Sequence, residues 1–224
     1  MPISPILISM KTAAVSILIT FFIGTFLAKL IADLKSERAK AVWDGLLTLP
    51  LVLPPTVVGF FLLYTFGARR PVGRFFLEYF GIKIAFSWGA TVIAAVVISL
   101  PLMYRSARGA FEQVDENLIY AGRTLGLSEW KIFWKILFPN AISGIISGAV
   151  LAFARGLGEF GATAMIAGNI LHKTRTLPLA VYSSVAAGDM NTAYKYVAII
   201  TIISFVIMLV MNYFASRERK RRRA

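Results

Sequence analysis

Long apolar runs alternate with short charged segments along the chain. Three of these runs contain no Asp, Glu, Lys or Arg, and each exceeds the ~20 residues that a helix needs to cross a hydrocarbon core of about 30 Å. Two further runs are long but carry a few ionisable residues. The pattern predicts an all-α integral membrane protein, one transmembrane domain over residues 1–224 with about five transmembrane helices, at Lys11–Ala32, Gly45–Gly67, Ile84–Tyr104, Pro139–Leu171 and Tyr196–Ser216.

Two of the predicted spans are irregular, and this makes them candidates for a translocation path. The second contains Pro50, Pro54 and Pro55, which remove backbone donors and kink a helix, so we expect it to pack inside the bundle near a pathway. The alternative is a kink that only improves packing.

The fourth span places Arg155 and Glu159 four residues apart among glycines. Such a pair within a membrane is costly and usually faces the bundle interior or a water-filled cavity. In a straight helix from Pro139, Arg155 would lie about 24 Å along the axis. Either the pair lines a path for an anion or it is buried and fixes helix packing. The candidate path residues are Pro54, Pro55, Arg155, Gly158 and Glu159.

The segment from 112 to 139 mixes polar and apolar residues and lies between two spans. We predict two short helices around Gly126, because glycine readily takes the left-handed conformation that ends a helix. Asp115 and Ser128 would cap their starts, and Pro139 would open the next span. The first helix would place Leu118, Ala121, Gly122 and Leu125 on one face, and the second is crowded with Trp130, Phe133 and Trp134. This amphipathic segment suggests docking of a partner.

Charge supports a topology. An odd number of spans places the termini on opposite sides, and the basic tail 217–224 should be cytoplasmic, with the N-terminus outside. The segment 112–139 would then also be cytoplasmic, and a further short helix over Thr176–Ala187 would lie outside. Topology accounts for the net charge of +13 better than nucleic acid does. A specific anionic-lipid or nucleic-acid site in the tail is the alternative. The group Arg69, Arg70 and Arg74 would lie outside, against the rule.

Composition excludes several classes of function. The chain is 58% hydrophobic and only 16% charged, whereas soluble domains are nearer a quarter charged. It has no cysteine and one histidine, His172, so we expect no metal site and no cofactor. It lacks the GxxxxGKS/T loop that cradles ATP phosphates, and no catalytic constellation is evident. We therefore do not expect an enzyme.

The segment 112–139 resembles the EAA loop of ABC importer permeases. Tyr120-Ala121-Gly122 is followed by Gly126, Ile136, Phe138 and Pro139 at the family's spacing, with Tyr120 in place of its glutamate, Gly122 of its second alanine and Phe138 of its leucine. The stretches LPLVLPPTVVG, AFSW, AGRTLG and LAFARGLGEFGAT are similar, in order, to the molybdate and sulfate branch of these permeases and cover the chain from about Leu49 to Thr163.

The resemblance implies a type I ABC importer permease fold and a homodimer that forms the pore. Two ABC ATPase subunits would dock on the cytoplasmic loop, and an extracytoplasmic oxyanion-binding protein would deliver molybdate or tungstate for transport by alternating access. Sulfate or thiosulfate import is the alternative within the family, and a stand-alone anion channel or secondary carrier is the alternative outside it. The residues expected to couple to the ATPase are Tyr120, Ala121, Gly122, Gly126, Ser128, Trp130 and Phe133.

Overall fold

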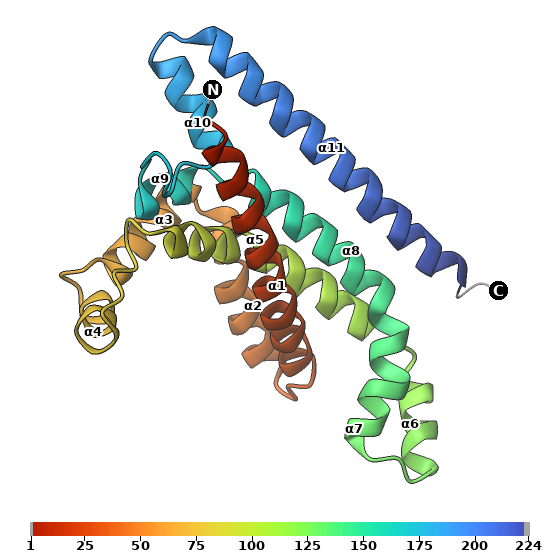
Figure 1. The fold of residues 1–224 in the computed structure, drawn as a ribbon. Coiled ribbons are helices and arrows are strands. Elements are labelled where there is room, and N and C mark those ends of the chain that lie inside the picture. Colours follow the sequence, from red (N-terminus) through yellow and green to blue (C-terminus); the bar gives the residue numbers. More distant parts are fainter. Residues whose placement is uncertain (1, 222–224) are drawn as a thin grey trace.

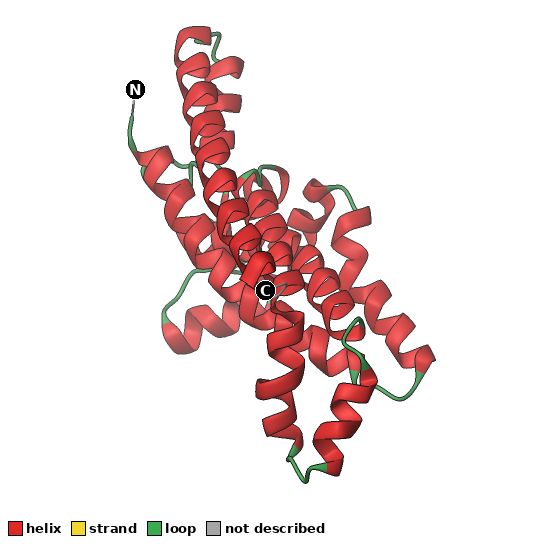
Figure 2. Ribbon diagram, turned by 90° about the vertical axis from the view of Figure 1, so that its right-hand side faces the viewer, coloured by secondary structure: helices red, strands yellow, loops and turns green. Residues whose placement is uncertain are grey.

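The structure is a computed structural model that describes the backbone of residues 2–221 and the side chains of residues 2–211 and 213. Every regular element in this range is helical (Figures 1 and 2). The basic tail 217–224 has no described side chains, so the prediction made for it lies outside the described residues. The elements are α1 (Ser4–Ala32), α2 (Glu37–Val52), α3 (Pro55–Phe66), α4 (Pro71–Phe80), α5 (Trp88–Glu112), α6 (Glu116–Thr124), α7 (Glu129–Ile132), the π-helical turn η1 (Phe133–Leu137), α8 (Phe138–Leu157), α9 (Gly161–Ala167), α10 (Leu177–Ala186) and α11 (Met190–Arg221).

Four helical segments in the described range are long and apolar enough to cross a membrane, and the bent pair α2 and α3 adds a fifth. The four are Ser4–Ala32, Trp88–Glu112, Glu129–Leu157 and Met190–Met211. The prediction of an all-α membrane protein with about five spans is confirmed.

Helix α5 lies at the centre and packs against α1 on one side and α8 on the other. Hydroxyl groups join α1 to α5, since Thr12 and Thr91 are 2.9 Å apart and Thr20 and Ser99 are 3.2 Å apart. Small residues bring α8 equally close to α5, because a Cβ added at Gly144 would lie 2.5 Å from the Cβ of Ala110. Small interface residues and polar pairs are the usual means by which helices associate where lipid supplies no hydrophobic drive.

The second predicted span is broken rather than merely kinked. Helices α2 and α3 meet at 111°, and the prediction that this span packs inside the bundle is wrong for α2, which has no buried residue within the chain. The break follows from Pro54 and Pro55: each proline pushes its predecessor out of the helical region, and Leu53 and Pro54 both have extended ψ angles. Pro55 then opens α3, where a missing amide proton costs nothing.

The fourth predicted span also has different limits. One helix runs from Glu129 to Leu157, and α9 is a separate short helix, so Arg155 lies in the last turn of a helix rather than inside one. Pro139 stands in the first turn of α8, as predicted, but α8 continues the preceding helix without a break. The π turn precedes it, with the amide of Phe138 donating to the carbonyl of Phe133, and this wider turn accommodates a ring that would strain an α-helix.

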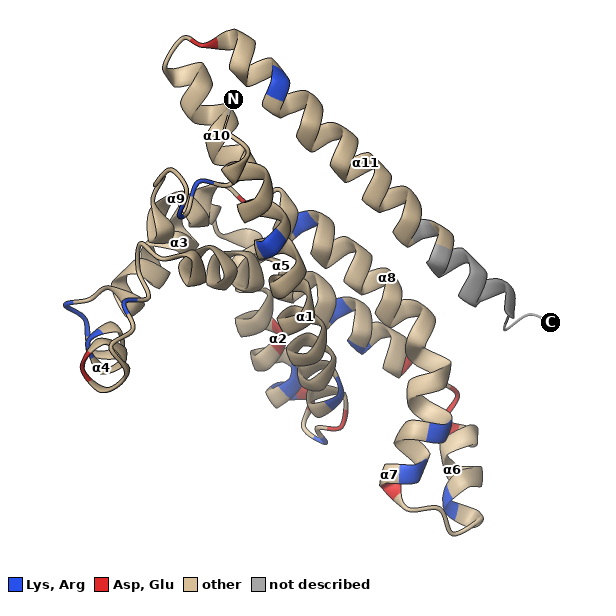
Figure 3. Cartoon of the chain, viewed as in Figure 1, with Lys and Arg blue, Asp and Glu red and all other residues tan. Residues whose placement is uncertain are grey.

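The two ends of the molecule differ in content. Helices α6 and α7 lie at one end, whereas α10 lies at the other, beside the N-terminus (Figure 1). The predicted helix over Thr176–Ala187 is confirmed as α10; the Ser9 hydroxyl accepts a 2.7 Å hydrogen bond from the Leu177 amide there. Lys and Arg gather on α2, α5, α6 and α7 toward the first end (Figure 3), which agrees with the predicted topology.

Helix α4 gives a reason for the group Arg69, Arg70 and Arg74. It projects to one side of the bundle with exposed Phe75, Tyr79 and Phe80 (Figure 1). The Arg70 guanidinium lies 3.9 Å from the Tyr64 ring, and Arg74 pairs with Glu78 at 2.6 Å. A short helix with aromatic residues and arginines is typical of the membrane interface, where basic residues are stable on either side.

We expect Gly59→Val to destabilise the protein, because a Cβ at this position would lie 2.7 Å from the Cα of Ala162. The Ala162 backbone could move away only at a cost in free energy. Overpacking of this kind costs ~1–3 kcal/mol. The measurement is the thermal unfolding midpoint in detergent. Gly45→Val is the matched control, since nothing lies within 4 Å of a Cβ there. Equal midpoints for the two variants would contradict the tight contact between α3 and α9.

Candidate functional site

The segment expected to couple to a partner forms a compact helical hairpin. Asp115 Oδ1 accepts a 2.9 Å hydrogen bond from the amide of Asn117, so the predicted cap of α6 is confirmed. Gly126 has a φ of +73°, and the amides of Gly126 and Leu127 donate to the carbonyls of Arg123 and Gly122. These two bonds form a Schellman motif, which confirms the predicted left-handed end of α6.

The predicted side-chain cap by Ser128 is wrong, because its hydroxyl makes no capping bond and only its carbonyl accepts from Ile132. The start of α7 is held instead by Arg123, whose guanidinium makes two hydrogen bonds, of 2.8 and 3.2 Å, to the Glu129 carboxylate. This carboxylate raises the pKa of Arg123. This exposed two-point ion pair bridges the turn between α6 and α7.

The predicted coupling residues divide into an exposed and a packed group. Tyr120, Ala121, Gly126, Ser128 and Trp130 are exposed, with Trp130 71% and Leu125 79% accessible. Gly122 is buried, and a Cβ there would lie 2.8 Å from Ile136 Cδ1. Phe133 is half-buried, 6.2 Å from the Phe111 ring of α5. The hairpin thus exposes aromatic and aliphatic side chains on its outer side, and its inner side packs against α5.

The candidate path residues meet where two helix breaks face each other. A Cβ on Gly161, at the start of α9, would lie 3.0 Å from Pro55 Cβ and 3.3 Å from the amide nitrogen of Thr56. The structure therefore brings the Pro54–Pro55 break against the break between α8 and α9. Gly158 is exposed within that second break.

Arg155 and Glu159 form the expected pair, with Nη1 and Oε2 2.9 Å apart. Glu159 is only 3% exposed, and its other oxygen accepts a 2.7 Å hydrogen bond from the Ala162 amide. The carboxylate therefore caps α9, and this contact favours the packing alternative for Glu159. The Arg155 side chain is one-third exposed, so part of the guanidinium remains available.

Sequence reasoning missed a second charged cluster. Arg108 on α5 forms an ion pair with Asp44 on α2 and another, of 2.7 Å, with Glu112. The Tyr104 hydroxyl donates to the same Asp44 carboxylate. The cluster joins α2 to the central helix, which compensates for the absence of buried residues in α2. The spacing of Tyr104, Arg108 and Glu112 at i, i+4 and i+8 was the available signal.

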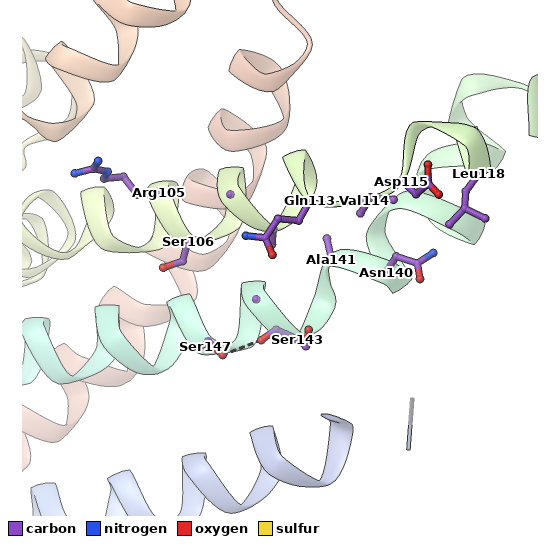
Figure 4. A pocket seen from close by; sticks show the side chains of 13 residues that line it. Arg105, Ser106, Gln113, Val114, Asp115, Leu118, Asn140, Ala141, Ser143 and Ser147 are labelled. Atoms are coloured by element: carbon purple, nitrogen blue, oxygen red, sulfur yellow. Dashed lines mark hydrogen bonds between the residues drawn. The ribbon is translucent and has the colours of Figure 1, made fainter. Parts of the chain in front are cut away.

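Sequence reasoning also missed a cleft of about 780 Å³ between α5 and α8 (Figure 4). Its walls come from the last turns of α5, the loop to α6 and the first turns of α8. It carries one arginine, one carboxylate and several neutral polar side chains, chiefly Arg105, Ser106, Gln113, Asp115, Asn140 and Ser143. No single stretch of sequence contains this set, because two helices contribute it.

Residues 21–221 match the family described as the binding-protein-dependent transport system inner membrane component. The chain belongs to this family. It is a multi-pass inner-membrane permease component of an ABC importer, so ATP hydrolysis belongs to a separate component, and an external binding protein is the other partner. Membership of this family overturns the alternative of a stand-alone channel or secondary carrier.

Similar proteins cover the whole length. The chain is 42% identical over 217 residues to the molybdenum transport system permease protein ModB of Escherichia coli K12, which spans 96% of this chain and 94% of that protein. It is 36% identical over 222 residues to ModB of Haemophilus influenzae, with 99% and 96% covered. The permease fold is also that of the MetNI methionine ABC transporter, with a TM-score of 0.73 at 17% identity over 96% of this chain and 94% of the other.

We expect Gly126→Val to loosen the hairpin, because an L residue in the left-handed conformation costs roughly 1–2 kcal/mol. The amide of Leu127, which bonds to Gly122, should exchange with deuterium roughly tenfold faster. Gly126→Asn is the control, since asparagine tolerates this conformation. Nothing lies within 4 Å of a Cβ at this position, so equal exchange in both variants would exclude backbone strain as the cause.

Proposed function

We propose that this permease imports molybdate or tungstate, received from an extracytoplasmic oxyanion-binding protein. The observation that carries the proposal is the similarity over almost the full length to proteins named molybdenum transport permeases. The scarcity of charges in the membrane helices supports it, because a tetrahedral dianion passes most easily where no strong site retains it. Sulfate or thiosulfate remains the second candidate, since the membrane helices require nothing specific to molybdenum.

The hairpin of α6 and α7 is the proposed docking site for the ABC ATPase. Its side chains Tyr120, Leu125 and Trp130 are exposed apolar groups that a partner could contact. The Schellman turn and the pair of Arg123 with Glu129 support the shape of the hairpin. With Tyr120 in place of the family's glutamate, contact rests on ring surface and shape rather than on a carboxylate. Two copies of the chain would form the pore and carry one ATPase each.

Motion of the docked ATPase would reach the membrane by two routes. The first is covalent, because α7, η1 and α8 form one helix from Glu129 to Leu157. The second is the tilted contact between the rings of Phe133 and Phe111, which ties the hairpin to α5. The breaks at Pro54–Pro55 and at Gly158 are proposed to flex at the far end of these helices, with Arg155 beside the path and Glu159 fixing its position.

Uptake by the reconstituted transporter tests the substrate. The permease, its ATPase and its binding protein are placed in proteoliposomes with ATP, and labelled molybdate is followed in the presence of unlabelled anions. Molybdate and tungstate should compete at equal concentration, whereas sulfate in hundredfold excess should not. Uptake of sulfate with no competition from molybdate would overturn the proposed substrate while leaving the permease assignment intact.

Docking and transmission can be separated with three variants. Trp130→Ala should reduce recovery of the ATPase on the permease, because this exposed ring is part of the docking surface. Phe133→Ala should retain the ATPase but uncouple hydrolysis from uptake, because the Phe111 contact is lost. Tyr79→Ala removes an equally exposed ring from α4 and is the control. Full recovery and uptake with Trp130→Ala would contradict the docking assignment.

A further inference from the structure

The cleft between α5 and α8 contains none of the residues assigned to docking or to the membrane path. It begins beside the coupling hairpin, because Asp115 and Leu118 line it, and it runs along α5 as far as Arg105 (Figure 4). Its volume of about 780 Å³ is larger than one oxyanion needs, and because Gly144 packs closely on Ala110, the space is a groove along the seam of α5 and α8 rather than a gap between them. Gly109 widens it, since nothing lies within 4 Å of a Cβ at that position.

The polar side chains of the cleft include uncommitted donors. The Ser106 hydroxyl and the Gln113 amide make no hydrogen bond to another described residue. Other polar groups are engaged: Ser147 donates to the Ser143 carbonyl at 2.9 Å, and Asn140 donates to the Ile136 carbonyl at 2.7 Å. The one carboxylate in the cleft, Asp115, already accepts the capping bond of α6. The uncommitted groups therefore include the donors of Ser106 and Gln113 as well as acceptor oxygens.

The cleft holds two charged side chains of opposite sign, Asp115 at the hairpin end and, at the other end, the one that would attract an anion, Arg105. Arg108 forms ion pairs with Asp44 and Glu112. Arg105 forms no ion pair with any residue whose side chain is described. Arg105 and Gly109 also line a smaller cleft of about 340 Å³ around the Asp44 cluster, so Arg105 stands where the two spaces join. In Figure 4 the Arg105 side chain points away from Ser106 and Gln113, so the exposed guanidinium and these donors would contact a passing oxyanion one after another rather than together.

We propose that the oxyanion leaves toward the cytoplasm through this cleft, with Arg105, Ser106 and Gln113 as its transient ligands. The inference rests on the proposed function, because it places the cleft on the cytoplasmic side with the hairpin. Weak, water-exposed contacts suit an exit, since a dianion held tightly there would slow each cycle. The same donors would suit the phosphate of a lipid headgroup, which the test distinguishes.

The absence of cysteine from the chain makes a direct test possible. Ser106→Cys and Ser143→Cys place single thiols in the cleft of the full transporter, and Ser204→Cys places one on α11 outside it. Inside-out vesicles of neutral lipid are treated with the anionic reagent 2-sulfonatoethyl methanethiosulfonate. Both cleft thiols should react, sodium molybdate should slow the reaction at position 106, and labelling should abolish uptake. The control thiol should not react.

The contribution of Arg105 is measured on the same system. Arg105→Gln should reduce both the protection by molybdate and the rate of uptake roughly tenfold, which corresponds to one charge-assisted hydrogen bond, and Arg105→Lys should restore part of each. Assembly with the ATPase should be unchanged in both variants. The lysine variant and the assembly assay separate loss of the site from misfolding.

The outcomes separate the proposals. If the wild type imports sulfate but not molybdate, the proposed substrate fails, yet protection of position 106 by sulfate still supports the exit route. If the wild type imports molybdate while the cleft thiols do not react, or Arg105→Gln transports normally, the exit route is wrong. Protection by added anionic lipid but by neither oxyanion would assign the cleft to a headgroup and overturn the proposal.

Discussion

Lipid offers no hydrogen bonds to a polypeptide backbone, and the rest of this structure depends on that constraint. Where the chain cannot remain helical, the exposed amides and carbonyls must be covered by protein. At the break, Pro54 and Pro55 have no amide proton that would need a partner. The break lies against Gly161. In the break after α8, the Glu159 carboxylate accepts a hydrogen bond from the Ala162 amide. The two interruptions therefore pack against each other, and the second is also capped by a residue of its own segment.

The same constraint explains why a charge pair is found beside a break. Glu159 is buried, but one oxygen binds Arg155 and the other binds a helix amide, so its charge is matched from two directions. The remaining rigidity comes from α1, α5 and α8, which approach closely through hydroxyl pairs and glycines. The molecule therefore combines a core of three closely packed helices with two interruptions that lie against each other.

Much of this was predictable from the sequence, where local chemistry decides the structure. The apolar runs indicate the spans, and Gly126 marks the end of α6, because a left-handed residue is a local property. The pairing of Arg155 with Glu159 follows from their spacing. The angle of 111° between α2 and α3 does not follow from Pro54 and Pro55, since prolines fix where a helix breaks but neighbouring helices fix its direction. The continuity through Pro139 depends on a π turn with no sequence mark, and the cleft depends on two helices meeting.

The π turn at Phe133–Leu137 has a consequence for the phase of the long helix. An α-helix advances about 100° per residue, so one additional residue in a single turn rotates everything beyond it by roughly that angle about the axis. The direction in which Trp130 points is thereby set independently of the direction in which Ser143 points. Five residues act as an angular offset between the proposed docking surface and the wall of the proposed passage. A change there would misalign two intact surfaces without altering either.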